Sequence, residues 1–174
     1  MGLIFLTGMT GSGKTVVGEK LAAKLGIAFI DLDAKVARTT GRKIPQIFAE
    51  EGESAFREQE ALALRRVAKT PEGVVALGAG ALERQASFEL VHAHGALVYL
   101  RASVDLLVER LHVLNDRPLL AGADTAEDLK ARLREMLARR ERHYLTAQIV
   151  IDIDDQTSVE STVDRICQIL KPSS

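Results

Sequence analysis

One stretch of eight residues near the N-terminus limits the folds open to this chain more than any other feature. Residues 8–15 read GMTGSGKT and match the pattern G-x-x-x-x-G-K-[ST] at every fixed position. The apolar run at 3–7 predicts a buried strand before this stretch, and apolar residues at helical spacing predict a helix after it. A phosphate-binding loop requires this order of strand, loop and helix, so the context favours such a loop over a glycine-rich turn before an ordinary helix.

The residue types in this loop suit the binding of a triphosphate. Gly8, Gly11 and Gly13 let backbone N–H groups approach phosphates closely, and the start of the following helix adds the positive end of its dipole. Lys14 supplies a mobile positive charge for the β and γ phosphates, and the Thr15 hydroxyl is suited to bind Mg²⁺. We therefore expect the loop to bind a nucleoside triphosphate together with Mg²⁺.

The composition indicates one compact domain that binds a small molecule. The chain has 174 residues, of which 47% are hydrophobic and 27% charged, which is sufficient for one core. The formal net charge of −1 and the lack of a Lys/Arg run argue against a nucleic-acid surface. The sequence enters a strand at once and has no apolar run of membrane-spanning length, so we expect no leader, no membrane contact and a cytoplasmic location. Cys167 is the only cysteine, which excludes an internal disulfide.

Apolar runs that alternate with helical patterns predict the fold class. Segments typical of buried strands occur at 3–7, 27–30, 74–77, 96–100 and 149–151. Helical patterns fill the intervals, at 16–25, 34–40, 45–51, 53–68, 83–94, 104–113, 125–143 and 158–170. This alternation predicts an α/β protein with three layers, in which a doubly wound, five-stranded parallel sheet lies between helices.

Two predicted strands end in residues that suit a ligand site. The second strand runs into Asp31 and Asp33, and the third runs into Gly78-Ala79-Gly80. The carboxyl ends of strands in an open parallel sheet line the ligand crevice, so we expect both groups beside the phosphate loop. Asp31 is the nearest candidate for a carboxylate on the metal side, because the third strand ends without an acidic residue. Two simpler interpretations stay open: Asp33 as the N-cap of the next helix, and 78–81 as an ordinary tight turn.

Two arginines on predicted helices are candidates for binding an anion. Glu60 falls on the apolar stripe of its helix, and Arg57 lies three residues earlier, where it can pair with this carboxylate. An exposed ion pair between them is an equally simple interpretation. Arg140 continues the apolar stripe of a later helix and so points toward the protein body, which costs free energy unless an anion is present.

An irregular segment separates two of the predicted helices. Residues 114–122 contain Arg117, Pro118 and Gly122 between two regular helical patterns. Irregular segments of this kind between rigid elements are typical of mobile lids over active sites. We therefore predict a lid at this place in the chain.

Taken together, these motifs resemble those of the shikimate kinase family, a member of the nucleoside monophosphate kinase group of P-loop folds. The resemblance covers almost the whole chain. It rests on the phosphate loop and on Asp31-Leu32-Asp33, Phe48, Gly52-Glu53, Phe56-Arg57 with Glu60, Leu77-Gly78-Ala79-Gly80, Arg117-Pro118-Leu119-Leu120, and Arg140 with Tyr144. The loop alone indicates only nucleotide binding, whereas the further elements at these separations are selective for the family.

The resemblance implies a strand order of 2-3-1-4-5 and the transfer of a phosphoryl group from ATP, with Mg²⁺, to the 3-hydroxyl of shikimate in aromatic amino acid biosynthesis. It implies one domain over 1–174, with a substrate-binding helical segment at about 33–60 and a lid at about 113–124; we expect a monomer. ATP contacts are implied for Gly8, Gly11, Ser12, Gly13, Lys14, Thr15, Val16, Arg110, Arg117 and Gln156, and metal contacts for Thr15 and Asp31. Substrate contacts are implied for Asp33, Arg57, Gly78, Ala79, Gly80 and Arg140. Lys14, Asp33 as a candidate base, and Arg117 would be the catalytic residues.

The chain departs from the family pattern after the third strand, where Gly78-Ala79-Gly80 replaces a run of three glycines. We expect φ of Ala79 to be negative, because the flanking glycines can absorb any unusual dihedral angles. Three functions are open: an active shikimate kinase, a kinase for another small polyhydroxy acid, and a non-catalytic binding protein derived from the family. The last is disfavoured by the intact Lys14, Thr15, Asp31 and Arg117.

Overall fold

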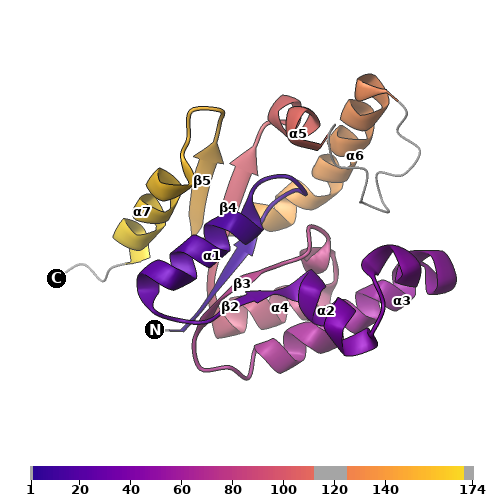
Figure 1. Ribbon diagram of the computed structural model, residues 1–174, viewed down its shortest axis with the longest axis horizontal. Helices are drawn as coiled ribbons and strands as arrows, with labels where there is room; N and C mark the ends of the chain where they lie inside the picture. Colours follow the sequence, from indigo (N-terminus) through magenta and orange to yellow (C-terminus); the bar gives the residue numbers. More distant parts are fainter. Residues whose placement is uncertain (1, 112–124, 171–174) are drawn as a thin grey trace.

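A five-stranded parallel sheet lies at the centre of the molecule, in the order β2-β3-β1-β4-β5. The structure, a computed structural model, describes residues 2–111 and 125–170 (Figure 1). Its strands are β1 (Leu3–Thr7), β2 (Phe29–Asp31), β3 (Gly73–Ala76), β4 (Gly95–Ala102) and β5 (Ile149–Ile153). The predicted five strands and their order are confirmed, and only the strand ends differ.

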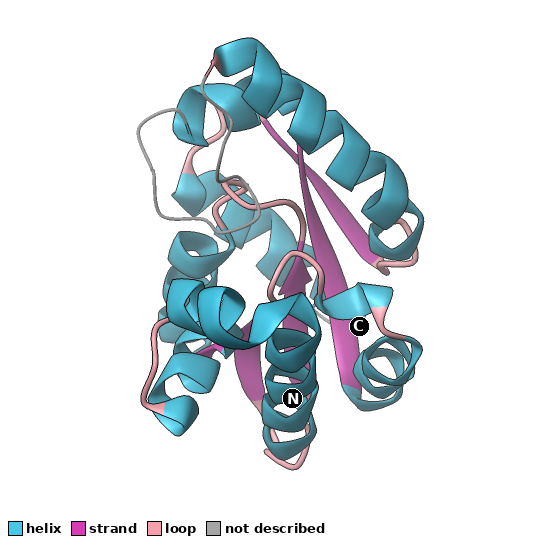
Figure 2. Cartoon of the chain, turned by 90° about the vertical axis from the view of Figure 1, so that its right-hand side faces the viewer, coloured by secondary structure: helices cyan, strands magenta, loops and turns pink. Residues whose placement is uncertain are grey.

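Helices cover both faces of this sheet (Figure 2). They are α1 (Lys14–Leu25), α2 (Leu32–Thr40), α3 (Ile44–Val67), α4 (Gln85–His94), α5 (Val104–Leu111), α6 (Ala126–Tyr144) and α7 (Val159–Leu170), with a short 3₁₀ helix, η1, at Ala81–Glu83. α1 packs beside α7, and α3 packs beside α2 and α4. This is the predicted three-layer, doubly wound arrangement. Among the residues that the structure describes, no helix is both long enough and apolar enough to cross a membrane.

The central strands are buried at every position, which explains their composition. β1 has the sequence LIFLT and β3 the sequence GVVA, and all of these residues are buried. Because helices cover both faces of the sheet, side chains on both sides of each strand must be apolar, and the alternation typical of a half-exposed strand is absent. Burial of each large apolar side chain contributes about 1.5–3 kcal/mol to folding.

The start of α2 differs from the sequence-based interpretation that gave Asp33 a capping role. Asp31 is the N-cap, and its Oδ1 accepts a hydrogen bond from the N–H of Ala34 at 3.1 Å. The interpretation of Asp33 as the cap is therefore wrong, since Asp33 lies within the first helical turn. Capping by Asp31 starts α2 two residues earlier than the sequence-based interpretation requires.

Three other predicted helices also change at their boundaries. The helices expected at 45–51 and 53–68 form one element, α3, with a kink at Gly52, where φ is 82° and ψ is 176°. This backbone conformation favours glycine, so Gly52 turns the chain without ending the element. The helix expected at 83–94 is divided into η1 and α4, which are separated at Arg84.

The carboxyl ends of β1, β2 and β3 bring the candidate residues to one edge of the sheet. β1 leads into the phosphate loop and β2 ends at Asp31, whereas β3 leads through Leu77 to Gly78. These three strands are neighbours and run in the same direction. Segments far apart in the sequence therefore meet where the ligand crevice of an open α/β sheet is expected.

Candidate active site

The phosphate loop has the backbone conformation that its glycines predict. φ is 138° at Gly8, 87° at Gly11 and 95° at Gly13, all in the region that disfavours other residues. A Cβ atom at Gly8 would lie 2.6 Å from the carbonyl oxygen of Leu100, so no side chain fits there. The Lys14 ammonium donates to the carbonyl oxygens of Gly8 (2.8 Å) and Met9 (3.0 Å), which holds its charge over the loop.

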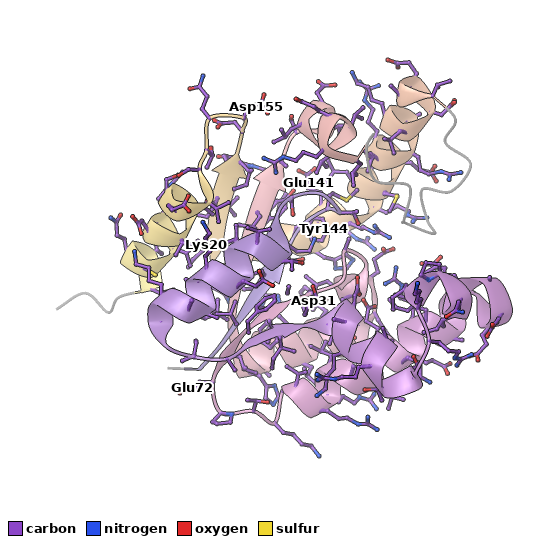
Figure 3. All side chains as sticks on the ribbon, in the orientation of Figure 1. Lys20, Asp31, Glu72, Glu141, Tyr144 and Asp155 are labelled. Carbon is purple, nitrogen blue, oxygen red and sulfur yellow. The ribbon has the colours of Figure 1, made fainter. Side chains whose placement is uncertain are left out.

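Thr15 and Asp31 meet beside this loop. The Thr15 hydroxyl donates to Asp31 Oδ2 at 2.9 Å, while Asp31 Oδ1 caps α2. Figure 3 places Asp31 near the middle of the molecule, between the strand that it ends and the start of α1. A hydroxyl and a carboxylate are the hard oxygen ligands that Mg²⁺ accepts, and Mg²⁺ usually takes its other ligands from phosphates and water. In the described part of the chain, no cluster of three or more His, Cys, Asp or Glu residues suited to a metal occurs.

The other residues predicted to contact ATP are less closely grouped. Arg110 on α5 donates through Nη1 to the carbonyl oxygen of Gly11 at 3.3 Å, which brings its guanidinium to the phosphate loop. Ser12 is buried, and its hydroxyl has no hydrogen-bond partner among the described residues. Val16 is 48% exposed on α1, and Gln156 is exposed in the turn after β5. Arg117 and the lid predicted at about 113–124 lie outside the described residues.

On the other side of the site, α3 supplies a pair of charged residues that is largely buried. Glu60 is 2% exposed and accepts a hydrogen bond from Arg57 Nη1 at 2.8 Å. Arg57 also donates from Nε (3.3 Å) and Nη2 (3.1 Å) to the half-exposed Glu53. Burial raises the pKa of the Glu60 carboxyl to about 7, against the opposing charge and hydrogen bond of Arg57. The interpretation of Arg57 and Glu60 as a simple exposed ion pair is therefore wrong.

The 78–83 segment, which follows β3, packs directly on these side chains. A Cβ atom at Gly78 would lie 2.2 Å from Glu60 Oε1 and 3.0 Å from Asp33 Oδ1. A Cβ atom at Gly80 would lie 2.3 Å from Arg57 Nη2. The two glycines are therefore needed for close approach, and the segment is more than an ordinary tight turn.

Ala79 can occupy the position between these glycines without backbone strain. Among the described residues, which include Ala79, only glycines have positive φ. The expectation that φ of Ala79 is negative is therefore confirmed. The buried hydroxyl of Tyr144 on α6 donates to the carbonyl oxygen of Ala79. Burial raises the pKa of Tyr144 well above its ordinary value, so this hydroxyl stays protonated and remains a donor.

Arg140 on α6 is the largest polar side chain buried in this region. It is 1% exposed, and its Nε donates to Glu83 of η1. Nη1 and Nη2 are also buried, and neither has a hydrogen-bond partner among the described residues. This burial confirms that Arg140 points inward, as its place on the apolar stripe predicts. A buried guanidinium with one open edge is costly unless an anion binds there.

Sequence reasoning missed two contacts in this site, those made by Glu83 and Tyr144. The sequence patterns place Glu83 only at the start of a helix, and only the family resemblance singles out Tyr144. Glu83 and Arg140 are separated by 57 positions, and Tyr144 and Ala79 by 65. No local pattern predicts either pair, because each depends on how α6 packs on the 78–83 segment.

Comparison with known proteins gives a consistent result. The family model described as shikimate kinase matches residues 10–171. The shikimate kinase of Chlorobaculum tepidum is 43% identical over 179 aligned positions, covering 99% of this chain and 94% of the relative. That of Chlorobaculum parvum is 44% identical over 168 positions, covering 94% and 89%.

Solved structures resemble this one over nearly the full length. The shikimate kinase from Acinetobacter baumannii in complex with shikimate has a TM-score of 0.90 at 34% identity, covering 98% of this chain and 93% of that chain. The shikimate kinase from Bacteroides thetaiotaomicron has a TM-score of 0.89 at 33% identity, covering 97% and 98%. The motifs, the strand order and the full-length matches agree, and the chain belongs to the shikimate kinase family.

Proposed function

We propose that this protein is an active shikimate kinase, which transfers a phosphoryl group from ATP to a hydroxyl of shikimate in aromatic amino acid biosynthesis. The observation that carries the proposal is the open edge of Arg140, a buried guanidinium whose Nη1 and Nη2 face no partner among the described residues. Shikimate has one carboxylate, and a planar guanidinium can donate two parallel hydrogen bonds to a carboxylate. Membership of the family supports the same substrate.

The phosphate loop would hold the triphosphate on the other side of the site. The N–H groups of its glycine backbone and the start of α1 would bind the phosphates, with Lys14 over the β and γ positions. Thr15 and Asp31 would hold Mg²⁺, which when bound neutralises charge on the phosphates. Arg110 and Gln156 are proposed for the adenine side, and Arg117 for the phosphates during transfer.

Asp33 is proposed as the group that accepts the proton of the attacking hydroxyl. Its Oδ1 lies next to Gly78, and Gly78 belongs to the 78–83 segment that also contacts Glu60 and Arg57. The Asp33 carboxylate is therefore proposed to lie on the substrate side of the site. Phosphoryl transfer depends mainly on positioning and on charge neutralisation. Lys14 should therefore contribute more to the rate than proton removal by Asp33.

The two substrate arginines would contribute unequally. Arg140 has two free N–H₂ groups, whereas Arg57 already donates to Glu53 and Glu60 from all three of its nitrogens. Arg57 would have to exchange the exposed Glu53 for the substrate. We therefore propose that Arg140 binds the carboxylate directly, and that Arg57 joins after Glu53 is displaced.

A coupled assay of ADP release over a panel of small hydroxy acids tests this proposal. With shikimate, turnover should depend on Mg²⁺ and exceed that with any other acid in the panel. Faster turnover of a different polyhydroxy acid would reassign the substrate, and binding without ADP release would indicate a non-catalytic member of the family. We also propose a single domain acting as a cytoplasmic monomer, which sedimentation of the purified protein can test for the oligomeric state.

A further inference from the structure

Glu83 has a place in the site that the phosphoryl-transfer reaction does not by itself require. Its carboxylate accepts the Nε–H of Arg140, whose side chain is 1% exposed, while its own side chain is 34% exposed. The pair therefore joins a buried cation on α6 to a carboxylate at the protein surface. A buried guanidinium N–H without an acceptor is costly, so the carboxylate oxygen that accepts from Nε decides which way the guanidinium is turned.

The contact leaves a specific set of donors for a ligand. A guanidinium can bind a carboxylate side-on, through Nε and one terminal nitrogen, or end-on, through Nη1 and Nη2. Glu83 occupies Nε, so only the end-on edge of Arg140 is open, and both of its nitrogens are buried without a partner in the described structure. The orientation of the guanidinium thus fixes the direction from which a carboxylate can bind.

Glu83 also connects Arg140 to the remainder of the substrate side. It ends the 78–83 segment, whose glycines contact Glu60, Asp33 and Arg57. Tyr144, one turn after Arg140 on α6, bonds to Ala79 of the same segment. Two contacts from consecutive turns of α6 therefore fix this helix against the segment, and the contact at Glu83 is the one that involves the guanidinium.

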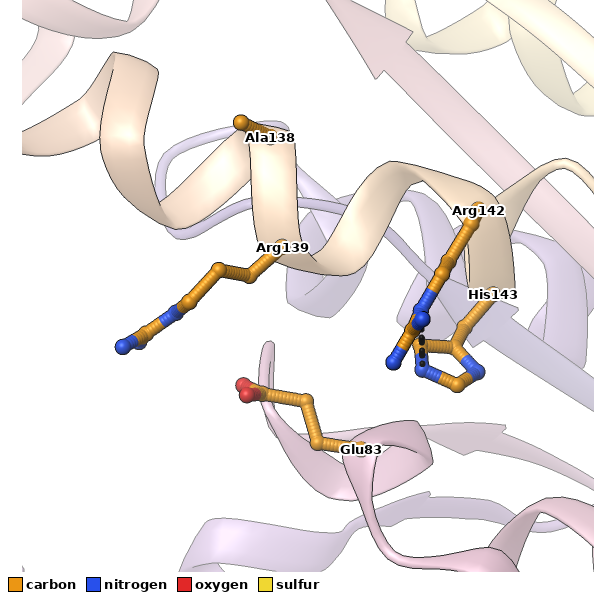
Figure 4. Close-up of a pocket in the computed structure, with 5 residues that line it drawn as sticks. All are labelled: Glu83, Ala138, Arg139, Arg142 and His143. Carbon is orange, nitrogen blue, oxygen red and sulfur yellow. Dashed lines mark hydrogen bonds between the residues drawn. The ribbon is translucent and has the colours of Figure 1, made fainter.

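The outer side of Glu83 faces other cations on α6. Glu83, Ala138, Arg139, Arg142 and His143 line a hollow of about 310 Å³, and Figure 4 shows Arg139 and Arg142 reaching down on either side of the Glu83 carboxylate. Arg142 donates from Nε to His143 at 3.2 Å. Glu83 nevertheless bonds to the buried Arg140, although two exposed arginines are nearby.

We propose that Glu83 is a positioning residue for substrate binding, because it holds Arg140 by Nε so that Nη1 and Nη2 receive the substrate carboxylate end-on. This inference rests on the proposed function for the identity of the carboxylate ligand. A positioning role differs from a purely structural role in its effect on ligand binding. Loss of a structural ion pair would weaken the binding of ligands with and without a carboxylate equally. The proposal also assigns the effect to the acceptor oxygen of Glu83 and not to its charge. Glutamine at this position keeps a carbonyl oxygen that can accept from Nε.

Calorimetric titration of shikimate into Glu83→Ala, Glu83→Gln and the wild type tests the inference. The Kd for shikimate should rise at least about tenfold in the alanine variant, which is the effect of losing a hydrogen bond to a charged group. In the glutamine variant it should stay within about threefold of the wild-type value. With shikimate amide in place of shikimate, the alanine variant and the wild type should agree within about threefold. The KM for ATP should be unchanged. Asp152→Asn is the matched control, because it removes a carboxylate that accepts from Nε of the exposed Arg101 at 2.6 Å, away from the 78–83 segment.

Several results would overturn the inference: shikimate binding by Glu83→Ala within about threefold of the wild type, equal losses in the alanine and glutamine variants, or an equal loss for the amide. If the alanine variant does not fold, NMR of the wild type labelled with ¹⁵N-arginine decides. The Nε–H of Arg140, assigned by its loss in Arg140→Lys, should be protected from exchange, and free exchange would refute the contact. Wild-type turnover of shikimate tests the proposed function separately, so failure of one is distinguishable from failure of the other.

Discussion

Replacement of Glu60 by glutamine should change how the stability of the protein depends on pH. Glu60 is 2% exposed, and burial raises its pKa to about 7 from 4.5, against the opposing effect of Arg57. In the folded protein this carboxyl therefore keeps its proton at pH values where the unfolded chain has lost it. The stabilisation that results is fully present below pH 4.5 and is lost as the pH rises through about 7.

The size of the effect follows from the two pKa values. Each unit of difference corresponds to about 1.4 kcal/mol, so the free energy of unfolding of the wild type should fall by about 2.5 kcal/mol between pH 5 and pH 8 from this group alone. The glutamine variant has no proton to lose and lacks this contribution. Its stability relative to the wild type should rise by about the same amount over that range.

Urea unfolding of both proteins at several pH values between 5 and 8 measures this difference. Glu53→Gln is the matched control, because Glu53 pairs with the same arginine but is 50% exposed. Its curve should run parallel to that of the wild type. Parallel curves for Glu60→Gln and the wild type would refute the conclusion that Glu60 is buried with a raised pKa.

Three further substitutions test the roles proposed for other residues. Lys14→Met should lower kcat by a factor of about 10²–10³, because the charge of Lys14 acts on phosphates, and should leave the circular dichroism spectrum unchanged. A folded variant that keeps more than about a third of wild-type ADP release would contradict this role. Arg140→Lys should weaken shikimate binding in calorimetry by roughly 1.5–3 kcal/mol, and by more than Arg57→Lys, because only Arg140 has an open edge; wild-type affinity in both would make them structural residues. Ala79→Gly should change the KM for shikimate by less than about fivefold and should not raise stability, because φ of Ala79 is not positive; a gain of about tenfold or more in kcat/KM would show that the alanine impairs shikimate use.

The sequence predicts the fold well because its signals are local. The strands are continuous apolar runs, and the phosphate loop requires a strand before it and a helix after it, so the five strands and α1 follow directly. The strand order came from the family resemblance, since local patterns do not determine which strands pair. The role of Asp31 as N-cap was not predicted, because the sequence allows either of two aspartates to cap the helix.

The arrangement of the proposed substrate side could be predicted from the sequence only in part. Arg140 could be identified because an arginine on an apolar stripe must point inward, and Arg57 with Glu60 because their spacing places them together. The link from Arg140 to Glu83 could not be predicted, because it depends on the packing of two elements that are far apart in the sequence. The same applies to the close approach of Gly78 and Gly80 to the charged side chains of α2 and α3.

The most direct test of the central claim is detection of the product by ³¹P NMR after incubation of the protein with ATP, Mg²⁺ and shikimate. Shikimate kinase activity predicts a new phosphomonoester signal that grows in proportion to ADP and is absent when shikimate is omitted or replaced by its amide. Release of inorganic phosphate without a phosphomonoester would show that the protein hydrolyses ATP but does not phosphorylate shikimate, and would contradict the proposed function.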